Sequence, residues 1–189
     1  MGRAFAYAAL AAGYRIILED VLADRLAAAQ ADIRGWLEAA AAGGRPDNES
    51  KERVLARLST AASVDLACRE ADLVMETLPE EMEMKIDVFC ILEKFARPGA
   101  ILATNATSLS ISEIAAVTTR AEHCVGVHLS SGAPEGNLLE IVRGRETSEE
   151  TVEACRGLGR RMGREVVVVP DLTVESRYQH RGPAHGKLG

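Results

Sequence analysis

The chain has 189 residues, 47% hydrophobic and 26% charged, a composition typical of one globular domain with at most a short appendage. A formal net charge of −6 and only 4% aromatic residues argue against nucleic acid as a partner, since phosphates attract basic surfaces and bases stack on aromatic rings. No apolar run approaches the roughly 20 residues that cross a bilayer, and the four cysteines form no C-x-x-C pair of the kind that binds zinc. We therefore expect a cytoplasmic chain with neither a membrane segment nor a metal.

The predicted elements alternate between strands and helices along most of the chain. In chain order they are a helix over residues 2–12, a strand over 16–18, helices over 21–42 and 49–58, a strand over 73–77, a helix over 79–95, a strand over 100–104, a helix over 112–116, strands over 124–128 and 138–142, a helix over 148–162 and a strand over 165–169. The two helices that follow the first strand form a helical hairpin. The pattern predicts a doubly wound α/β domain with a largely parallel sheet over residues 1–171, followed by an irregular tail over residues 172–189.

The segment from Ala100 to Val142 contains the most informative residues. His128 ends an apolar run, and Glu140 lies twelve positions on, inside another. A loop of small polar residues follows the preceding strand; its members are Thr104, Asn105, Thr107 and Ser108. A carboxylate can orient an imidazole and stabilise its cation, which makes the pair a candidate general-base site. Thr107 or Ser108 would then hydrogen-bond a substrate hydroxyl. The alternatives are a strand-end histidine, a solvated acid and hydroxyls that bond their own turn.

Two further pairs of residues suggest a ligand at the edge of this sheet. Asp20 ends a strand about 18 residues beyond Gly2, where a Rossmann nucleotide site places the acid that bonds the ribose. Gly2 would be the last glycine of that G-x-G-x-x-G fingerprint. Glu80 and Lys85 begin the helix after the strand over residues 73–77; they are either a surface charge pair or two groups at the carboxyl edge, where open α/β sheets bind ligands.

Several segments resemble, in order and spacing, the NAD-binding domain of the 3-hydroxyacyl-CoA dehydrogenases, the 3-hydroxybutyryl-CoA type included. They are MGRAFAYAALAAGYRIILED, ADLVMETLPEEMEMK, ILATNATSLSISEIA, GVHL, LLEIVRGRETSEETVE and GREVVVVPD. The resemblance covers residues 1–171. It implies a Rossmann-like fold with a helical hairpin after the family's second strand, which here is the strand over 16–18. It also implies NAD as cofactor and oxidation of a 3-hydroxyacyl-CoA to a 3-ketoacyl-CoA, in fatty acid β-oxidation or butanoate metabolism.

The resemblance implies a role for individual residues. His128 stands at the family's catalytic base, Glu140 at the carboxylate that orients it, and Thr107 at a serine that touches both substrate and cofactor. Ser108 matches a second serine and is expected to share substrate binding. The cofactor-binding positions that the resemblance implies are, in chain order, Gly2, Asp20, Glu80, Lys85, Asn105, Thr107 and Ser131.

The chain also departs from the family pattern. HLSSGAP, at residues 128–134, replaces H-F-F-N-P-x-P, so Ser131 takes the place of an asparagine near the nicotinamide and Gly132 that of a proline. We expect the family's first strand and its C-terminal helical domain to be missing, which would leave unpaired strand edges in the sheet and impair turnover by this chain alone.

Two alternative functions stay open at this point. The chain could be a non-catalytic or partner-dependent NAD-binding module, completed as a homodimer or by a separate helical domain. It could also be a related Rossmann dehydrogenase that acts on a different hydroxy acid. In each case the carboxylate of Asp20 favours NAD over NADP, because it repels a 2′-phosphate.

Overall fold

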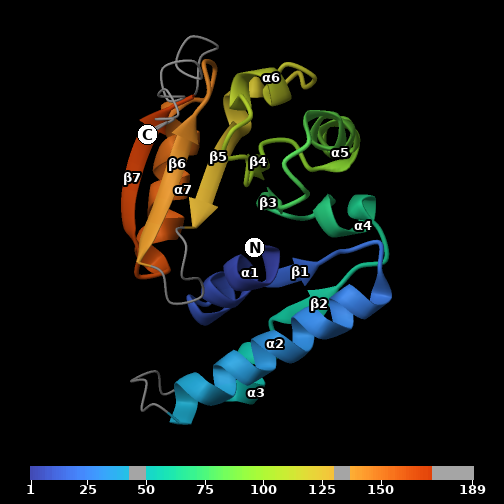
Figure 1. Ribbon diagram of the computed structural model, residues 1–189, viewed down its shortest axis with the longest axis vertical. Coiled ribbons are helices and arrows are strands. Elements are labelled where there is room, and N and C mark those ends of the chain that lie inside the picture. Colours follow the sequence, from blue (N-terminus) through green and yellow to red (C-terminus); the bar gives the residue numbers. More distant parts are fainter. Residues whose placement is uncertain (43–49, 130–136, 172–189) are drawn as a thin grey trace, which may run out of the picture.

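The computed structural model describes residues 1–42, 50–129 and 137–171, in which helices cover both faces of a layer of strands (Figure 1). The strands are β1 (Ile16–Leu18), β2 (Leu58–Thr60), β3 (Leu73–Glu76), β4 (Ile101–Thr104), β5 (Cys124–Leu129), β6 (Leu138–Arg143) and β7 (Glu165–Pro170). The helices are α1 (Gly2–Ala11), α2 (Ala23–Ala42), α3 (Lys51–Leu55), α4 (Val64–Cys68), α5 (Met82–Phe95), α6 (Ile111–Ala115), α7 (Glu149–Arg161) and a 3-10 turn at Ala121–His123. None of the helices in these three ranges has the length and apolar character needed to cross a membrane.

The strands form two sheets. β1 and β2 are a parallel pair, and the second sheet has the order β3-β4-β5-β6-β7. β3, β4 and β5 are parallel, β6 runs antiparallel to β5, and β7 runs parallel to β6. Within the described ranges no ladder joins β1 to β3. The predicted doubly wound, largely parallel α/β fold is therefore confirmed, and the sheet is interrupted between β1 and β3.

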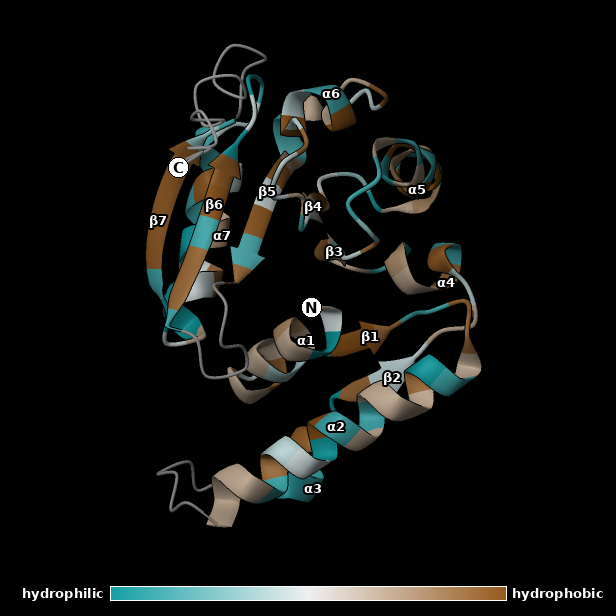
Figure 2. Ribbon diagram, viewed as in Figure 1, coloured by the Kyte–Doolittle hydropathy of each residue, from teal (hydrophilic) through white to brown (hydrophobic). Residues whose placement is uncertain are grey.

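Both faces of the five-stranded sheet are buried by helices. One core cluster packs α1 and α7 against alternate residues of β5 and β6, among them Val125, Val127, Leu139 and Ile141. On the opposite face of the sheet, α5 and α6 pack against the strand residues that point the other way, such as Leu102 and Val142. Figure 2 shows the result: β6 and β7 are largely hydrophobic, whereas α2 and α7 alternate between hydrophobic and hydrophilic residues. His128 and Glu140 belong to the same face as α5 and α6.

Helix α1 connects the two sheets. Every residue from Ala4 to Leu10 is buried, because one side of the helix faces β3 and β5 while the other faces α2 and α3. The helix ends as the sequence predicts, at a glycine that lies just beyond its C-cap in the left-handed region (Gly13, φ 92°). Gly13 N–H donates to Leu10 O and Tyr14 N–H donates to Ala9 O, the two bonds of a Schellman motif.

The structure corrects the prediction between the hairpin and β3. The helix expected over residues 49–58 ends at Leu55, and Leu58 instead belongs to β2, which pairs with β1. β2 has only three residues and two of them are exposed, so it has no apolar alternation to detect. The short helix α4 was not predicted either. The hairpin itself is confirmed, because Ile33 and Leu37 of α2 form one cluster with Val54 of α3. The connection between the two hairpin helices, at residues 43–49, and the predicted tail over 172–189 lie outside the described residues.

Candidate active site

The carboxyl ends of β3, β4 and β5 lie at one edge of the sheet, and helix α1 begins at the same edge. A Cβ on Gly2 would lie 2.7 Å from Oγ1 of Thr77, the residue after β3. Such a close approach of a helix to a strand end is what the last glycine of the nucleotide fingerprint provides. Gly2 is therefore packed against the end of β3, the strand that leads to Glu80 and Lys85.

His128, Asn105 and Glu140 come together at this edge. The antiparallel register of β5 and β6 places His128 directly opposite Glu140, so their side chains share a face with Cβ atoms about 5 Å apart. Both residues are half-buried. Among the described residues the imidazole makes one hydrogen bond, between its Nδ1 and Oδ1 of Asn105 at 3.1 Å, and none to Glu140. Because an amide oxygen can only accept, this contact places the proton on Nδ1 and leaves a lone pair on Nε2.

Thr107 and Ser108 are held by Glu80. Oε1 of Glu80 accepts the backbone N–H groups of Thr107 (2.8 Å) and Ser108 (2.6 Å), and the hydroxyls of Ser108 (3.0 Å) and Thr107 (3.4 Å). Burial of Glu80 opposes its ionisation, but the bonds from Ser108 and Thr107 and the nearby Lys85 cation outweigh it, so the pKa of Glu80 lies below its usual value. Both hydroxyls predicted to bind substrate are therefore already bonded to a carboxylate.

Lys85 lies deeper than the sequence suggests. Its side chain is fully buried, and Nζ lies 3.0 Å from each carboxylate oxygen of Glu76 and 3.2 Å from the carbonyl oxygen of Leu78. Glu76 also accepts from the Thr104 hydroxyl and the Leu78 N–H. Lys85 is therefore paired with Glu76 rather than with Glu80, and its ammonium group faces the interior rather than the cleft edge. Contact of Lys85 with a cofactor stays a prediction, and it would require the ammonium group to leave Glu76.

Sequence reasoning missed Glu76 and the part that Thr104 plays beside it. A signal for Glu76 was present, because it ends the apolar strand LVME just as Glu19 and Asp20 follow the strand IIL. The buried lysine nine positions later gave no signal, since helix α5 is charged on much of its surface. Together Glu76, Lys85 and Thr104 fix the carboxyl ends of β3 and β4 beneath the Asn105 loop.

The residues predicted to hold a nucleotide fit that group at two points. Helix α1 has no side-chain cap and no acid in its first turn, so the positive end of its dipole is not neutralised and suits a phosphate. Asp20 follows β1, which returns to the edge where α1 starts, and its Oδ1 accepts from the Leu22 N–H at 2.9 Å. Its other oxygen makes no bond within the described part of the chain. Ser131 lies outside the described residues.

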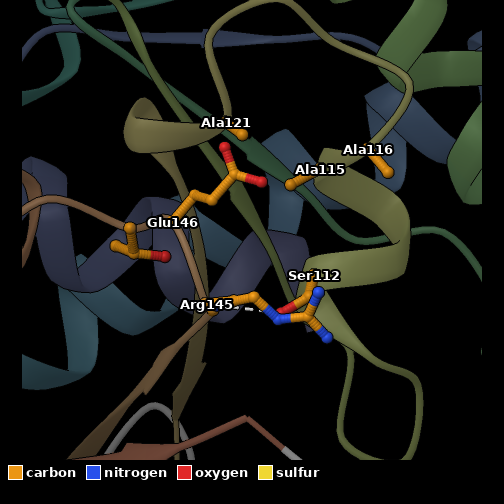
Figure 3. A pocket seen from close by; sticks show the side chains of 8 residues that line it. Ser112, Ala115, Ala116, Ala121, Arg145 and Glu146 are labelled. Carbon is orange, nitrogen blue, oxygen red and sulfur yellow. Dashed lines mark hydrogen bonds between the residues drawn. The ribbon is translucent and has the colours of Figure 1, made fainter.

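A surface pocket lies at the opposite edge of the sheet from His128. Figure 3 shows it between α6 and the loop after β6, and its lining residues are Ser112, Ala115, Ala116, Ala121, Gly144, Arg145, Glu146 and Thr147. It contains none of the predicted site residues. One of its lining residues joins two segments of the fold: the Thr147 hydroxyl donates to the carbonyl oxygen of Cys124 at 2.7 Å. Within the described ranges no group of His, Cys, Asp and Glu side chains is arranged to hold a metal ion.

Parallel strands with helices on both faces, an open helix N-terminus and an acid after the next strand define a dinucleotide-binding domain of the Rossmann type. The model of the family "3-hydroxyacyl-CoA dehydrogenase, NAD binding domain" matches residues 1–172. The chain therefore belongs to the 3-hydroxyacyl-CoA dehydrogenase family and carries its NAD-binding domain, which confirms the resemblance found in the sequence.

The relatives share most of this chain. It is 35% identical over 172 residues to a 3-hydroxybutyryl-CoA dehydrogenase of Bradyrhizobium diazoefficiens, a match that covers 91% of the chain and 58% of that protein. A probable 3-hydroxybutyryl-CoA dehydrogenase of Bacillus subtilis is 34% identical, with 91% of the chain and 60% of the relative covered. The crystal structure of the Escherichia coli K12 3-hydroxybutyryl-CoA dehydrogenase superposes with a TM-score of 0.85 at 33% identity, covering 90% of this chain and 36% of that one. The chain thus spans about three fifths of the length of the Bradyrhizobium and Bacillus relatives.

Proposed function

We propose that this chain is the nucleotide-binding and base-carrying part of an NAD-dependent 3-hydroxyacyl-CoA dehydrogenase. The observation that carries the proposal is the group formed by His128, Asn105 and Glu140 at the carboxyl edge of a domain of that family. The reaction converts the C3 alcohol of a 3-hydroxyacyl-CoA to a ketone: the hydroxyl proton leaves as H⁺, and the C3 hydrogen leaves as hydride. NAD, when bound, supplies the hydride acceptor.

His128 is the base in this proposal. Its Nδ1 is committed to Asn105, so Nε2 has the free lone pair that takes the hydroxyl proton as the carbonyl forms. The imidazolium that results lies on the residue opposite Glu140 in the strand register, and a carboxylate at that position stabilises the positive charge. Asn105 therefore sets the tautomer of His128 before proton transfer, and Glu140 stabilises the charge of the ring after it.

Thr107 and Ser108 bind the substrate oxygen in this proposal. The one proton of the substrate 3-hydroxyl points to Nε2 of His128, so a Thr107 or Ser108 hydroxyl binds the substrate oxygen by donating to it. This requires that hydroxyl to turn away from Glu80, whose contact with the Thr107 hydroxyl is the longest of the four at 3.4 Å. At the cofactor side, the N-terminus of α1 would receive the pyrophosphate and Asp20 the adenosine ribose, with Gly2 allowing the close approach. The acid at position 20 favours NAD over NADP.

Turnover by this chain alone is expected to be impaired, and a homodimer or a separate helical domain would complete the acyl-CoA cleft. The sheet is interrupted next to the proposed nucleotide site. This observation keeps the second candidate function, a partner-dependent NAD-binding module without activity of its own. We place either form in the cytoplasm.

Calorimetric titration with NADH, followed by a reduction assay with acetoacetyl-CoA, tests the proposal. NADH binding in the micromolar range and NADH oxidation that is abolished by His128→Gln would support it. Binding without turnover, with activity restored by adding the helical region of a relative, would support the partner-dependent form. No NADH binding, or activity that survives His128→Gln, would contradict both the cofactor and the base.

A further inference from the structure

Glu80 makes a dense set of contacts with a loop that is distant in sequence. Four donors converge on its Oε1, namely the backbone N–H and the hydroxyl of both Thr107 and Ser108. The two backbone contacts are the shortest, at 2.8 and 2.6 Å. Glu80 lies 27 and 28 positions away from these residues, so the contacts belong to the tertiary structure and are not the local turn bonds that Ser and Thr often make.

The same loop carries the partner of the proposed base. Asn105 lies two residues before Thr107; its backbone N–H donates to the carbonyl oxygen of Glu76 at 2.9 Å, and its Oδ1 meets Nδ1 of His128 at 3.1 Å. Ala106, between them, is buried. The loop is therefore fixed by β3 at Asn105 and by Glu80 two residues later. The side chain that contacts His128 therefore belongs to a short segment with two tertiary attachments.

We propose that Glu80 is a positioning residue for His128, which it orients through the loop from Asn105 to Ser108. The proposal rests on the proposed function, in which His128 is the base. In this proposal the Glu80 carboxylate holds the loop, whereas the family resemblance implied that it contacts the cofactor directly. When the carboxylate is removed, four donors lose their common acceptor, the loop rotates, and Asn105 no longer selects the Nδ1–H tautomer.

The expected effect is moderate, because Glu80, Thr107 and Ser108 are exposed to solvent and water can replace part of what the carboxylate provides. In Glu80→Ala we expect the amide hydrogens of Thr107 and Ser108 to exchange about five- to tenfold faster, as loss of about 1 kcal/mol of hydrogen bonding implies. We also expect the ring nitrogen shifts of His128 to move from an Nδ1–H pattern toward a mixture of both tautomers.

Nitrogen-15 NMR of the full chain measures both effects without substrate or cofactor. The variants are Glu80→Ala, Glu80→Gln and Glu81→Ala, with His128→Gln used to assign the ring signals. Glu81 is the matched control, because it is exposed and adjacent, and its side chain makes no hydrogen bond within the described residues. Glu81→Ala should resemble the natural chain. Glu80→Gln should give an intermediate result, since a neutral amide oxygen still accepts but more weakly than a carboxylate.

Two results would overturn the proposal. If Glu80→Ala speeds exchange at Thr107 and Ser108 but leaves the His128 tautomer unchanged, Glu80 holds the loop without acting on the imidazole. If exchange at these two residues is unchanged, Glu80 does not hold the loop. Under turnover conditions, Glu80→Ala should lower kcat with little change in KM for NADH, whereas a direct cofactor contact would raise that KM. A tautomer shift with unchanged kcat would instead contradict the role of His128 as base and leave the positioning effect intact.

Discussion

Replacing Lys85 with methionine should destabilise the chain by about 3–5 kcal/mol, because it leaves a buried carboxylate without its cation. Lys85 is fully buried, and its ammonium group makes three contacts: one to each oxygen of Glu76 and one to the Leu78 carbonyl oxygen. Methionine has a similar length and fills the same space, so little packing energy is lost. Glu76 keeps the Thr104 hydroxyl and the Leu78 N–H as donors, which places the expected loss near the lower limit.

Urea unfolding monitored by circular dichroism measures this loss, and for a chain of this size it corresponds to a melting temperature lower by about 6–20 °C. The double variant Lys85→Met, Glu76→Gln should be more stable than Lys85→Met alone, since a neutral amide tolerates burial better than an unpaired carboxylate. Lys94→Met is the matched control on the same helix: Lys94 is exposed and lies 5.0 Å above the Phe95 ring, so its loss should matter by about 1 kcal/mol at most.

Unchanged stability in Lys85→Met, together with weaker NADH binding, would refute this reasoning. It would mean that Lys85 reaches the cofactor in solution and that the buried pair with Glu76 contributes little. Equal destabilisation by the single and the double variant would show that loss of the lysine packing, and not the unpaired charge, is responsible.

Three further predictions concern the nucleotide edge and the end of β7. Gly2→Ala places a Cβ 2.7 Å from Oγ1 of Thr77 and should lower stability in thermal unfolding by about 1–3 kcal/mol; Thr77→Ala in the same chain should recover most of it, and a lack of recovery would contradict the steric cause. Asp20→Ala should raise NADPH affinity relative to NADH about fivefold in calorimetry, since one repulsive charge is removed; an unchanged preference would remove Asp20 from the site. Burial of Asp171 opposes its ionisation, but hydrogen bonds from Ser112, Ile111 and Ser110 outweigh it, so the pKa of Asp171 is lowered. The ionised carboxylate therefore stabilises the fold at neutral pH. This contribution is lost as the pH falls from the ordinary value of 3.8 through the lowered pKa. The stability difference between the natural chain and Asp171→Asn should therefore be large at neutral pH and shrink in strong acid, and a constant difference in urea unfolding would contradict this.

The fold was predictable wherever a local rule applies. Gly13 ends α1 in the left-handed region, and Ser148 caps α7 with its side chain on the Thr151 N–H, so both boundaries follow from residue chemistry. β2 could not be predicted in this way, because its three residues become a strand only by pairing with β1. The direction of β6 was predictable but was not predicted: only residues 130–137 separate it from β5, too few for a parallel crossover.

The candidate site was predictable in its residue types but not in its pairing. The sequence shows that His128 ends one apolar run and that Glu140 interrupts the next, and the structure adds the register that puts them opposite each other. Nothing in the sequence could indicate that Glu80 bonds the loop at Thr107 or that Lys85 turns inward to Glu76, because both contacts depend on how α5 packs on the sheet. Charged side chains at a strand end can face a ligand or the interior, and only tertiary packing decides which.

The missing ladder between β1 and β3 has a consequence for how the molecule responds to stress. In the described part of the chain, the region up to β2 packs on the later strands mainly through the side chains of α1, and Arg161 of α7 donates to the carbonyl oxygen of Ala12; no strand ladder joins the two sheets. We expect that region to detach at a lower temperature or denaturant concentration than β3–β7, giving two melting steps where an uninterrupted sheet would give one. The apolar residues of α1 would then meet solvent and other molecules, so concentrated solutions should precipitate at the first step while the rest of the protein is still folded.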